Sequence, residues 1–176
     1  MSPSGVPEPS AWVQRFTARV PAGGEVLDLA CGSGRHSRLF LALGHGVVAL
    51  DRDTTRLADL TGTPGLEVIE ADLEAGGPFP LAGRRFAGIV VTNYLHRPLF
   101  PALIAALEPG GALIYETFAQ GNARFGKPSN PDFLLKPGEL LEAVRGRLRV
   151  IAYEDLIVEQ PRPAAVQRLC AVREDT

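Results

Sequence analysis

The sequence VLDLACGSGRHS at residues 26–37 places a strand-like apolar run, a glycine turn and a helix start directly after one another. Gly32 and Gly34 permit positive φ angles and leave no Cβ between the backbone and a ligand. The free N–H groups at the start of the helix face the same crevice, so a ligand can lie against this backbone. Purely structural strand-to-helix turns also use such glycines. Other residues of the chain are needed to distinguish a ligand-binding turn from a structural one.

Short apolar runs alternate with helical patterns on both sides of this turn. Each apolar run is typical of a buried strand, and we expect strands at 25–30, 46–51, 66–71, 86–92 and 112–117. We expect helices at 11–20, 35–43, 53–60, 98–107 and 138–144. Asp53 is the expected cap of the third helix, and EPGG closes the fourth. This order predicts a doubly wound α/β sheet, mostly parallel, with helices on both faces.

Two segments depart from the alternation. The connection between residues 71 and 86 has little helical pattern, which predicts an abbreviated crossover. The β-rich runs 148–158 and 165–173 are joined by a link too short for a parallel crossover, so we expect a C-terminal antiparallel hairpin.

The size and composition fit one domain. The chain has 176 residues, 45% of them hydrophobic, and we expect a single domain at 11–176 after a flexible arm at 1–10 that holds three prolines. A net charge of −2 weighs against a nucleic-acid partner. With no secretory signal and no apolar stretch long enough for a membrane, we expect a cytoplasmic protein. Cys31 and Cys170 are too few for a disulfide scaffold, and no spacing predicts a metal site.

Three acids accompany the glycine turn. Asp28 lies in the first strand, Asp51 ends the second and Asp72 follows the third. The carboxyl ends of parallel strands line one crevice, so these carboxylates suit a ligand rich in hydrogen-bond donors. Asp51 can accept from both hydroxyls of a ribose, and Asp72 from the exocyclic amine of adenine.

With these residues the chain resembles the class I S-adenosylmethionine-dependent methyltransferases. The resemblance is carried by DLACGSGRHS, the acid of VALDRD, EADLE, TNYLHR and LEPGGALIYET, between residues 26 and 117. It implies a seven-stranded Rossmann-like sheet whose last strand is inserted antiparallel. It also implies S-adenosylmethionine as the cofactor, with its methionine part on the Ala30 to Gly34 backbone and beside Asn93, its ribose on Asp51, and its adenine at Asp72 and Leu73. The candidate cofactor-binding residues are therefore Asp28, Ala30, Gly32, Gly34, Asp51, Arg52, Asp72, Leu73 and Asn93.

A dinucleotide dehydrogenase shares the strand, the glycine turn and the second-strand acid. Its GxGxxG fingerprint asks for Gly or Ala where this chain has Ser37. The third acid and the PGG before the fifth strand also favour the methyltransferase.

Methyl transfer from a sulfonium is an in-line displacement that depends mainly on alignment, so few groups are required for the chemistry. We expect His96 and Glu116, which follow the fourth strand and end the fifth, as candidate general bases. For each, a merely structural role stays open, as it does for Arg97 as a binder of an acidic substrate. TNYLHR lacks the paired prolines of the NPPY pattern, which argues against a flipped base as substrate.

Residues 118–136 show no clear period, and a loop of this length is typical of a lid. Arg124, Phe125 and Lys127 alternate basic and aromatic groups, so the loop can cover a small anionic or aromatic acceptor. Its layout is similar to the tellurite-resistance type of methyltransferase. The sequence therefore predicts methylation of a small-molecule O, S or N acceptor. A non-catalytic S-adenosylmethionine-binding protein and an RNA methyltransferase stay open as alternatives, and the oligomeric state stays undetermined.

Overall fold

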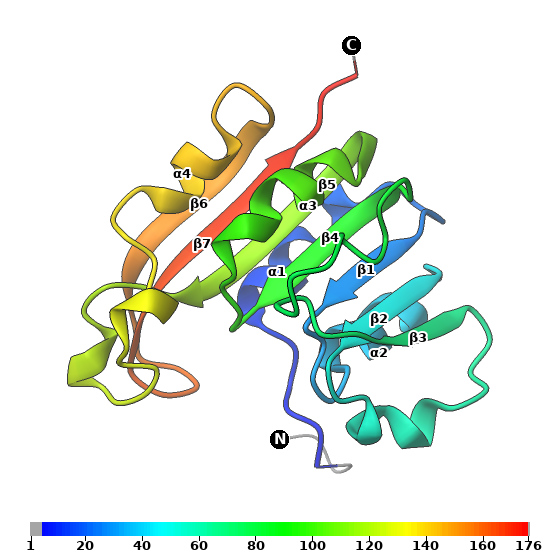
Figure 1. Cartoon of the computed structure of the whole chain (residues 1–176), viewed down its shortest axis with the longest axis horizontal. Coiled ribbons are helices and arrows are strands. Elements are labelled where there is room, and N and C mark those ends of the chain that lie inside the picture. Colours follow the sequence, from blue (N-terminus) through cyan, green and yellow to red (C-terminus); the bar gives the residue numbers. More distant parts are fainter. Residues whose placement is uncertain (1–4, 176) are drawn as a thin grey trace.

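The computed structural model describes residues 5–175, which form one twisted sheet covered by helices (Figure 1). The sheet has seven strands: β1 Val26–Leu29, β2 Val47–Asp51, β3 Leu66–Glu70, β4 Phe86–Thr92, β5 Leu107–Phe118, β6 Arg149–Val158 and β7 Ala164–Val172. The α-helices are α1 Ala11–Phe16, α2 Arg35–Ala42, α3 Phe100–Ala105 and α4 Glu139–Val144. Short 3-10 helices lie at Thr17–Arg19 (η1), Thr55–Leu60 (η2), Arg97–Leu99 (η3), Asn122–Arg124 (η4) and Pro131–Phe133 (η5).

The strand order is β3-β2-β1-β4-β5-β7-β6. The first five strands run parallel, while β7 lies antiparallel between β5 and β6. This confirms the predicted mostly parallel, seven-stranded sheet and its C-terminal antiparallel hairpin. The order reverses between β1 and β4, the position at which open α/β sheets bind their ligands.

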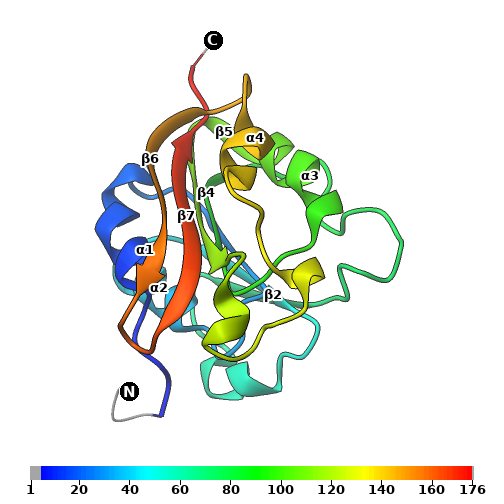
Figure 2. The same cartoon turned by 90° about the vertical axis from the view of Figure 1, so that its left-hand side faces the viewer.

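Helices cover both faces of the sheet, as predicted (Figure 2). On one face α1 and α2 bury Trp12, Phe16 and Phe40 against β1, β4 and β5. On the other face α3 and α4 bury apolar side chains such as Leu103 and Leu140. Ser10 caps α1, with its hydroxyl accepting from the amides of Trp12 and Val13. These two cores fix the strand ends at which the site is built.

Two predicted elements differ from the structure near the second and third strands. The expected helix at 53–60 is the 3-10 helix η2, although the Asp53 carboxylate does bind the Thr55 amide at its start. Its backbone hydrogen bonds run to the third preceding residue, from the Leu57 amide to the Thr54 carbonyl and from the Thr61 amide to the Ala58 carbonyl, which is the 3-10 pattern. Strand β3 is not buried, since Val68 is 41% exposed. It is an edge strand, and the abbreviated crossover between β3 and β4 places no helix over it within the described chain.

The predicted helix at 98–107 ends at Ala105, and EPGG belongs to the fifth strand. Leu107 already pairs with Phe86 of β4, and the register shifts before Gly88 pairs with Ala112. A Cβ on Gly111 would lie 2.9 Å from the Glu108 carbonyl oxygen and 3.0 Å from that of Phe86. The glycine is therefore needed for the close approach of β5 to β4, and not for a helix stop.

The expected flexible arm at 1–10 is only partly within the described chain, because residues 1–4 lie outside it. The end of this segment is fixed against the body. Ser10 is buried, its amide donates to His36 Nε2 at 3.0 Å, and its hydroxyl donates to Glu116 at 2.8 Å. The prediction of a loose arm is therefore wrong at Ser10, because capping of α1 and contacts with α2 and β5 hold it. Within residues 5–175, no helix has the length and hydropathy required to span a membrane.

Candidate functional site

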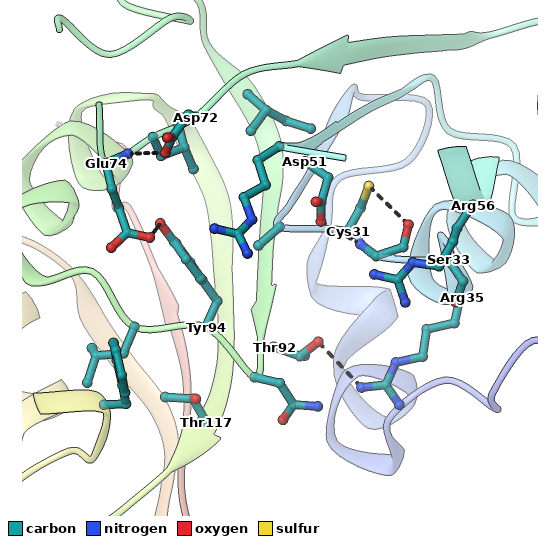
Figure 3. Close-up of a pocket in the computed structure, with 18 of the residues that line it drawn as sticks. Cys31, Ser33, Arg35, Asp51, Arg56, Asp72, Glu74, Thr92, Tyr94 and Thr117 are labelled. Carbon is teal, nitrogen blue, oxygen red and sulfur yellow. Dashed lines mark hydrogen bonds between the residues drawn. The ribbon is translucent and has the colours of Figure 1, made fainter. Parts of the chain in front are cut away.

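A cavity of about 720 Å³ opens at the carboxyl ends of the parallel strands (Figure 3). Its walls come from the glycine turn after β1, the ends of β2 to β5 and the segments that follow them. Of the predicted site residues, seven line it: Ala30, Gly32, Asp51, Arg52, Asp72, Leu73 and Asn93. Asp28, Gly34, His96 and Glu116 are not among the residues that line it.

Asp28 supports the glycine turn from inside the protein. Its side chain is 3% exposed, and one carboxylate oxygen accepts from the Ser37 amide at 2.9 Å and from the Ser37 hydroxyl at 2.7 Å. Burial raises the pKa of Asp28 to about 6, against the lowering effect of the Ser37 hydrogen bonds. The expected direct contact with a ligand is therefore corrected: Asp28 fixes the start of α2 behind the cavity.

Gly34 also lies outside the cavity wall and supports the glycine turn. It is the residue before α2, with a φ of +77°, and a Cβ there would meet Leu57 Cδ2 at 2.7 Å. Gly32, with a φ of +57°, does line the cavity, and its amide donates to Asp51 Oδ2 at 2.9 Å. The turn is thus held against the end of β2 by the same acid that the sequence predicts as the ribose-binding group.

Asp51 keeps acceptor capacity toward the cavity. Oδ2 accepts from Gly32 N, and Oδ1 accepts from the Asp53 amide at 3.0 Å. A carboxylate offers about four lone-pair directions, so both oxygens can take one more donor. Two adjacent hydroxyl donors, such as those of a ribose, match this arrangement.

Asp72 and Leu73 lie one strand further out, after β3. Asp72 Oδ1 accepts from the Glu74 amide at 2.9 Å, which turns the chain around the cavity rim. The second oxygen of Asp72 has no hydrogen bond within residues 5–175. This part of the wall offers one acid and one apolar side chain, the pair expected for an adenine ring.

Within residues 5–175, two non-glycine residues have positive φ angles, Ala30 at 54° and Asn93 at 55°. They follow the neighbouring strands β1 and β4, and both line the cavity. Side chains rarely adopt this conformation, and it gathers at binding and active sites. The sequence predicted both residues for the site but gave no sign of their backbone geometry.

Glu116 lies away from the cavity, on the side of the sheet that faces α1. Its carboxylate pairs with Arg168 at 2.5 Å and accepts from the Ser10 hydroxyl at 2.8 Å. Arg168 also pairs with Glu154 at 2.9 Å. With these partners Glu116 positions the N-terminal segment, and the geometry does not support its role as a general base.

His96 also lies outside the cavity wall. Its Nδ1 is 3.6 Å from Glu74 Oε1, while Tyr94 Oη donates to Glu74 Oε2 at 3.3 Å. Tyr94 and Glu74 do line the cavity, and Figure 3 shows them side by side. Burial and the adjacent Glu74 raise the pKa of Tyr94, so its phenol stays protonated. The structure therefore brings Glu74 and Tyr94, and not His96, to the rim.

Arg97 is a structural residue rather than a substrate-binding one. Its guanidinium binds both oxygens of Glu139, at 2.6 and 3.0 Å. It also donates to the carbonyls of Asp132 and Leu134, at 2.8 and 2.9 Å. These four hydrogen bonds tie the 118–136 segment to α4 through Arg97.

The 118–136 segment forms part of the cavity wall, but through other residues than predicted. Phe118, Pro128 and Phe133 line the cavity, whereas Arg124 lies over the ring of Phe125, 5.0 Å from its centroid. Asn122 is 2% exposed and holds the segment by donating to the Pro128 carbonyl at 3.0 Å and accepting from the Ala165 amide. A wall fixed in this way differs from the lid that the lack of periodicity predicted.

Sequence reasoning missed several wall residues, namely Pro7, Arg35, Arg56, Glu74, Thr117 and Phe133. Arg35 follows the glycine turn directly, and that position is a signal that could have found it. Pro7 and Phe133 carried no such signal, because only the fold brings distant segments over the strand ends. Among the described residues, no group of three His, Cys, Asp or Glu side chains could hold a metal ion.

The chain is similar in sequence to several methyltransferases. Residues 14–75 match the family model for the tellurite resistance protein TehB. The chain is 35% identical over 108 residues to the ribosomal protein L11 methyltransferase of Bordetella parapertussis, covering 59% of this chain and 33% of that protein. It is 38% identical over 103 residues to the trans-aconitate 2-methyltransferase of Rhizobium meliloti, covering 54% of this chain and 40% of that protein.

Solved structures show the same fold over nearly the whole chain. TehB from Haemophilus influenzae superposes with a TM-score of 0.73 at 20% identity, covering 92% of this chain and 61% of that one. The glycopeptide N-methyltransferase MtfA, solved with S-adenosylhomocysteine, gives a TM-score of 0.66 at 24% identity, covering 95% and 90%. The fold is therefore the Rossmann-like fold of S-adenosylmethionine-dependent methyltransferases. The chain spans only about a third to two fifths of the curated relatives, so their activities do not transfer by similarity alone.

Proposed function

We propose that this chain is an S-adenosylmethionine-dependent methyltransferase that acts on a small molecule. One observation carries the proposal: the glycine turn, Asp51 and Asp72 lie along one cavity, at the ends of three adjacent strands of a methyltransferase-type sheet. The match to the TehB family model covers this same part of the chain.

The residues present fit the cofactor. Asp51 would hold the ribose, and Asp72 with Leu73 would hold the adenine. The turn from Ala30 to Gly32 and the Asn93 side chain would hold the methionine part. When bound, S-adenosylmethionine supplies a methyl group activated on a sulfonium. The chain's own contribution is to bind the two reactants, align them and exclude water.

The cavity volume of about 720 Å³ lies within the range for small-molecule sites. Three arginines and three carboxylates line the cavity, and the net charge of the chain is −2, which does not favour nucleic acid as the acceptor. The relatives named for trans-aconitate support a small acceptor. Those named for ribosomal protein L11 make a protein acceptor the second candidate. Methyl transfer to purified L11 but to no small molecule would favour the second candidate.

Calorimetry with S-adenosylhomocysteine tests the proposal. We expect micromolar binding by the wild type and a loss of about tenfold to a hundredfold in Asp51→Ala, which removes two charge-assisted hydrogen bonds. Asp59→Ala is the matched control, because Asp59 pairs with Arg38 at 2.6 Å and does not line the cavity. The proposal fails if the wild type does not bind, or if both variants lose affinity equally.

A further inference from the structure

The two ends of the cavity differ in chemistry. The strand order puts the wall segments after β2 and β3 at one end and those after β5 at the other, with β1 and β4 between. The candidate ribose and adenine residues belong to the β2 and β3 end. We call the opposite part the acceptor end; it is lined by Pro7, Arg35, Thr117, Phe118, Pro128 and Phe133.

Arg35 is the charged group of the acceptor end. Its guanidinium reaches from α2 to the end of β4, where it donates to Thr92 Oγ1 at 3.4 Å (Figure 3). It also donates to the Glu8 carbonyl at 3.0 Å. Both partners are neutral, and within residues 5–175 no carboxylate forms an ion pair with Arg35. Arg38, Arg97 and Arg168, by contrast, all have carboxylate partners.

This cation is partly withdrawn from water, and burial lowers the pKa of Arg35. Glu116 and Asp28 act on it only through space, because Glu116 is held by Arg168 and Asp28 by Ser37. A half-buried charge without an opposite charge is costly to the fold. An anionic ligand in the acceptor end would compensate it with a bidentate, charge-assisted pair.

The other polar group of the acceptor end is also a donor. Thr117 is 2% exposed, lines the cavity, and its hydroxyl makes no hydrogen bond within the described chain. The carboxylates that line the cavity, Asp51, Asp72 and Glu74, come from the end of β2 and from the segment after β3. The acceptor end therefore offers hydrogen-bond donors and apolar rings but no base.

We propose that the acceptor is a small carboxylic acid, held by the Arg35 guanidinium and the Thr117 hydroxyl against Phe118 and Phe133, and methylated on its carboxylate oxygen. This rests on the proposed function. A carboxylate is ionised at neutral pH and needs no base. Its oxygen forms a bond to the methyl carbon, the bond from that carbon to sulfur breaks, and the electron pair stays on sulfur. The products are a methyl ester and S-adenosylhomocysteine, and no proton is released.

Binding to the protein saturated with S-adenosylhomocysteine tests this assignment without turnover. The probes are benzoate, cinnamate and itaconate, with benzamide and cinnamamide as uncharged matches. We expect the acids to bind at least about tenfold more tightly than the amides, and Arg35→Gln to remove that preference, since hydrogen bonds to charged groups have this strength. Arg35→Lys should retain part of it. Arg15→Gln on α1, 60% exposed, is the control.

Several results would overturn the assignment. One is that the acids bind no better than the amides. Another is that Arg35→Gln weakens S-adenosylhomocysteine but not methylthioadenosine, which lacks the amino-acid end, because Arg35 would then serve the cofactor. If the wild type does not bind S-adenosylhomocysteine, the proposed function itself fails. A turnover assay with S-adenosylmethionine labelled with tritium in its methyl group tests the ester. We expect a product that releases labelled methanol in alkali, and no proton released per turnover. An alkali-stable product would contradict the ester.

Discussion

Asp28 is an acid that the fold keeps out of water. The residue is 3% exposed, and its carboxylate accepts two hydrogen bonds from Ser37 and lies behind the glycine turn. From the sequence it looks like the first of three equal acids along the sheet. Asp28 is the second-to-last residue of β1, and its side chain points into the interior of the protein. Of the three acids, therefore, only Asp51 and Asp72 line the cavity.

The raised pKa of Asp28, about 6, has a consequence for stability. Between about pH 4 and pH 6 the unfolded chain loses this proton before the folded chain does, so stability falls as the pH rises through that window. As the pH rises through this window, the free energy of unfolding of the wild type should fall by about 2 to 3 kcal/mol more than that of Asp28→Asn.

Urea unfolding of both proteins from pH 4 to pH 6.5 measures this difference. The comparison with the variant is needed because His36 has the opposite effect on stability. Burial lowers the pKa of His36 to about 3, so this histidine decreases the free energy of unfolding as the pH drops below about 6.5. Since His36 is present in both proteins, its effect cancels. Parallel pH curves for the two proteins would show that Asp28 is not the titrating group.

The element that departs most from its sequence pattern is the segment after β5. Residues 118–136 have no periodicity, and the sequence predicted a lid. The structure holds the segment at both ends of its path, through the buried Asn122 and through the four hydrogen bonds of Arg97 to Glu139 and two carbonyls. Such long-range polar contacts leave no mark in local sequence, and this explains the difference.

Removal of the Arg97 contacts should loosen this wall. We expect Arg97→Gln to lower the free energy of unfolding by about 1 to 3 kcal/mol, because Glu139 loses a charged partner and two carbonyls lose donors. Amide hydrogen exchange should accelerate in residues 120–136 and stay unchanged in β1 and β4. Arg145→Gln is the control, since the Arg145 side chain is 78% exposed and its one ion pair within residues 5–175 is with Glu142. Equal exchange in both variants would show that Arg97 does not fix the wall.

At the scale of the whole molecule, the sequence predicted the sheet and most of its helices. Buried apolar runs and the glycine turn can be predicted because each has a local sequence pattern. The C-terminal hairpin can be predicted because the link between its two strands is too short for a parallel crossover. The edge position of β3 and the strand character of EPGG were not predicted, because both depend on which strand lies beside them. The same holds for the site: Asp51, Asp72 and Asn93 follow from strand ends, whereas Pro7, Arg35, Thr117 and Phe133 meet only in the folded chain.

The central claim is that one cavity of this molecule binds the methyl donor. A crystal structure of the chain with S-adenosylhomocysteine tests it most directly. We predict the ribose hydroxyls on the Asp51 carboxylate, the adenine beside Asp72 and Leu73, and the amino-acid end at the Ala30 to Gly32 turn and Asn93, with the acceptor end left open beside Arg35 and Thr117. S-adenosylhomocysteine bound elsewhere, or its absence from the crystal at saturating concentration, would contradict the claim.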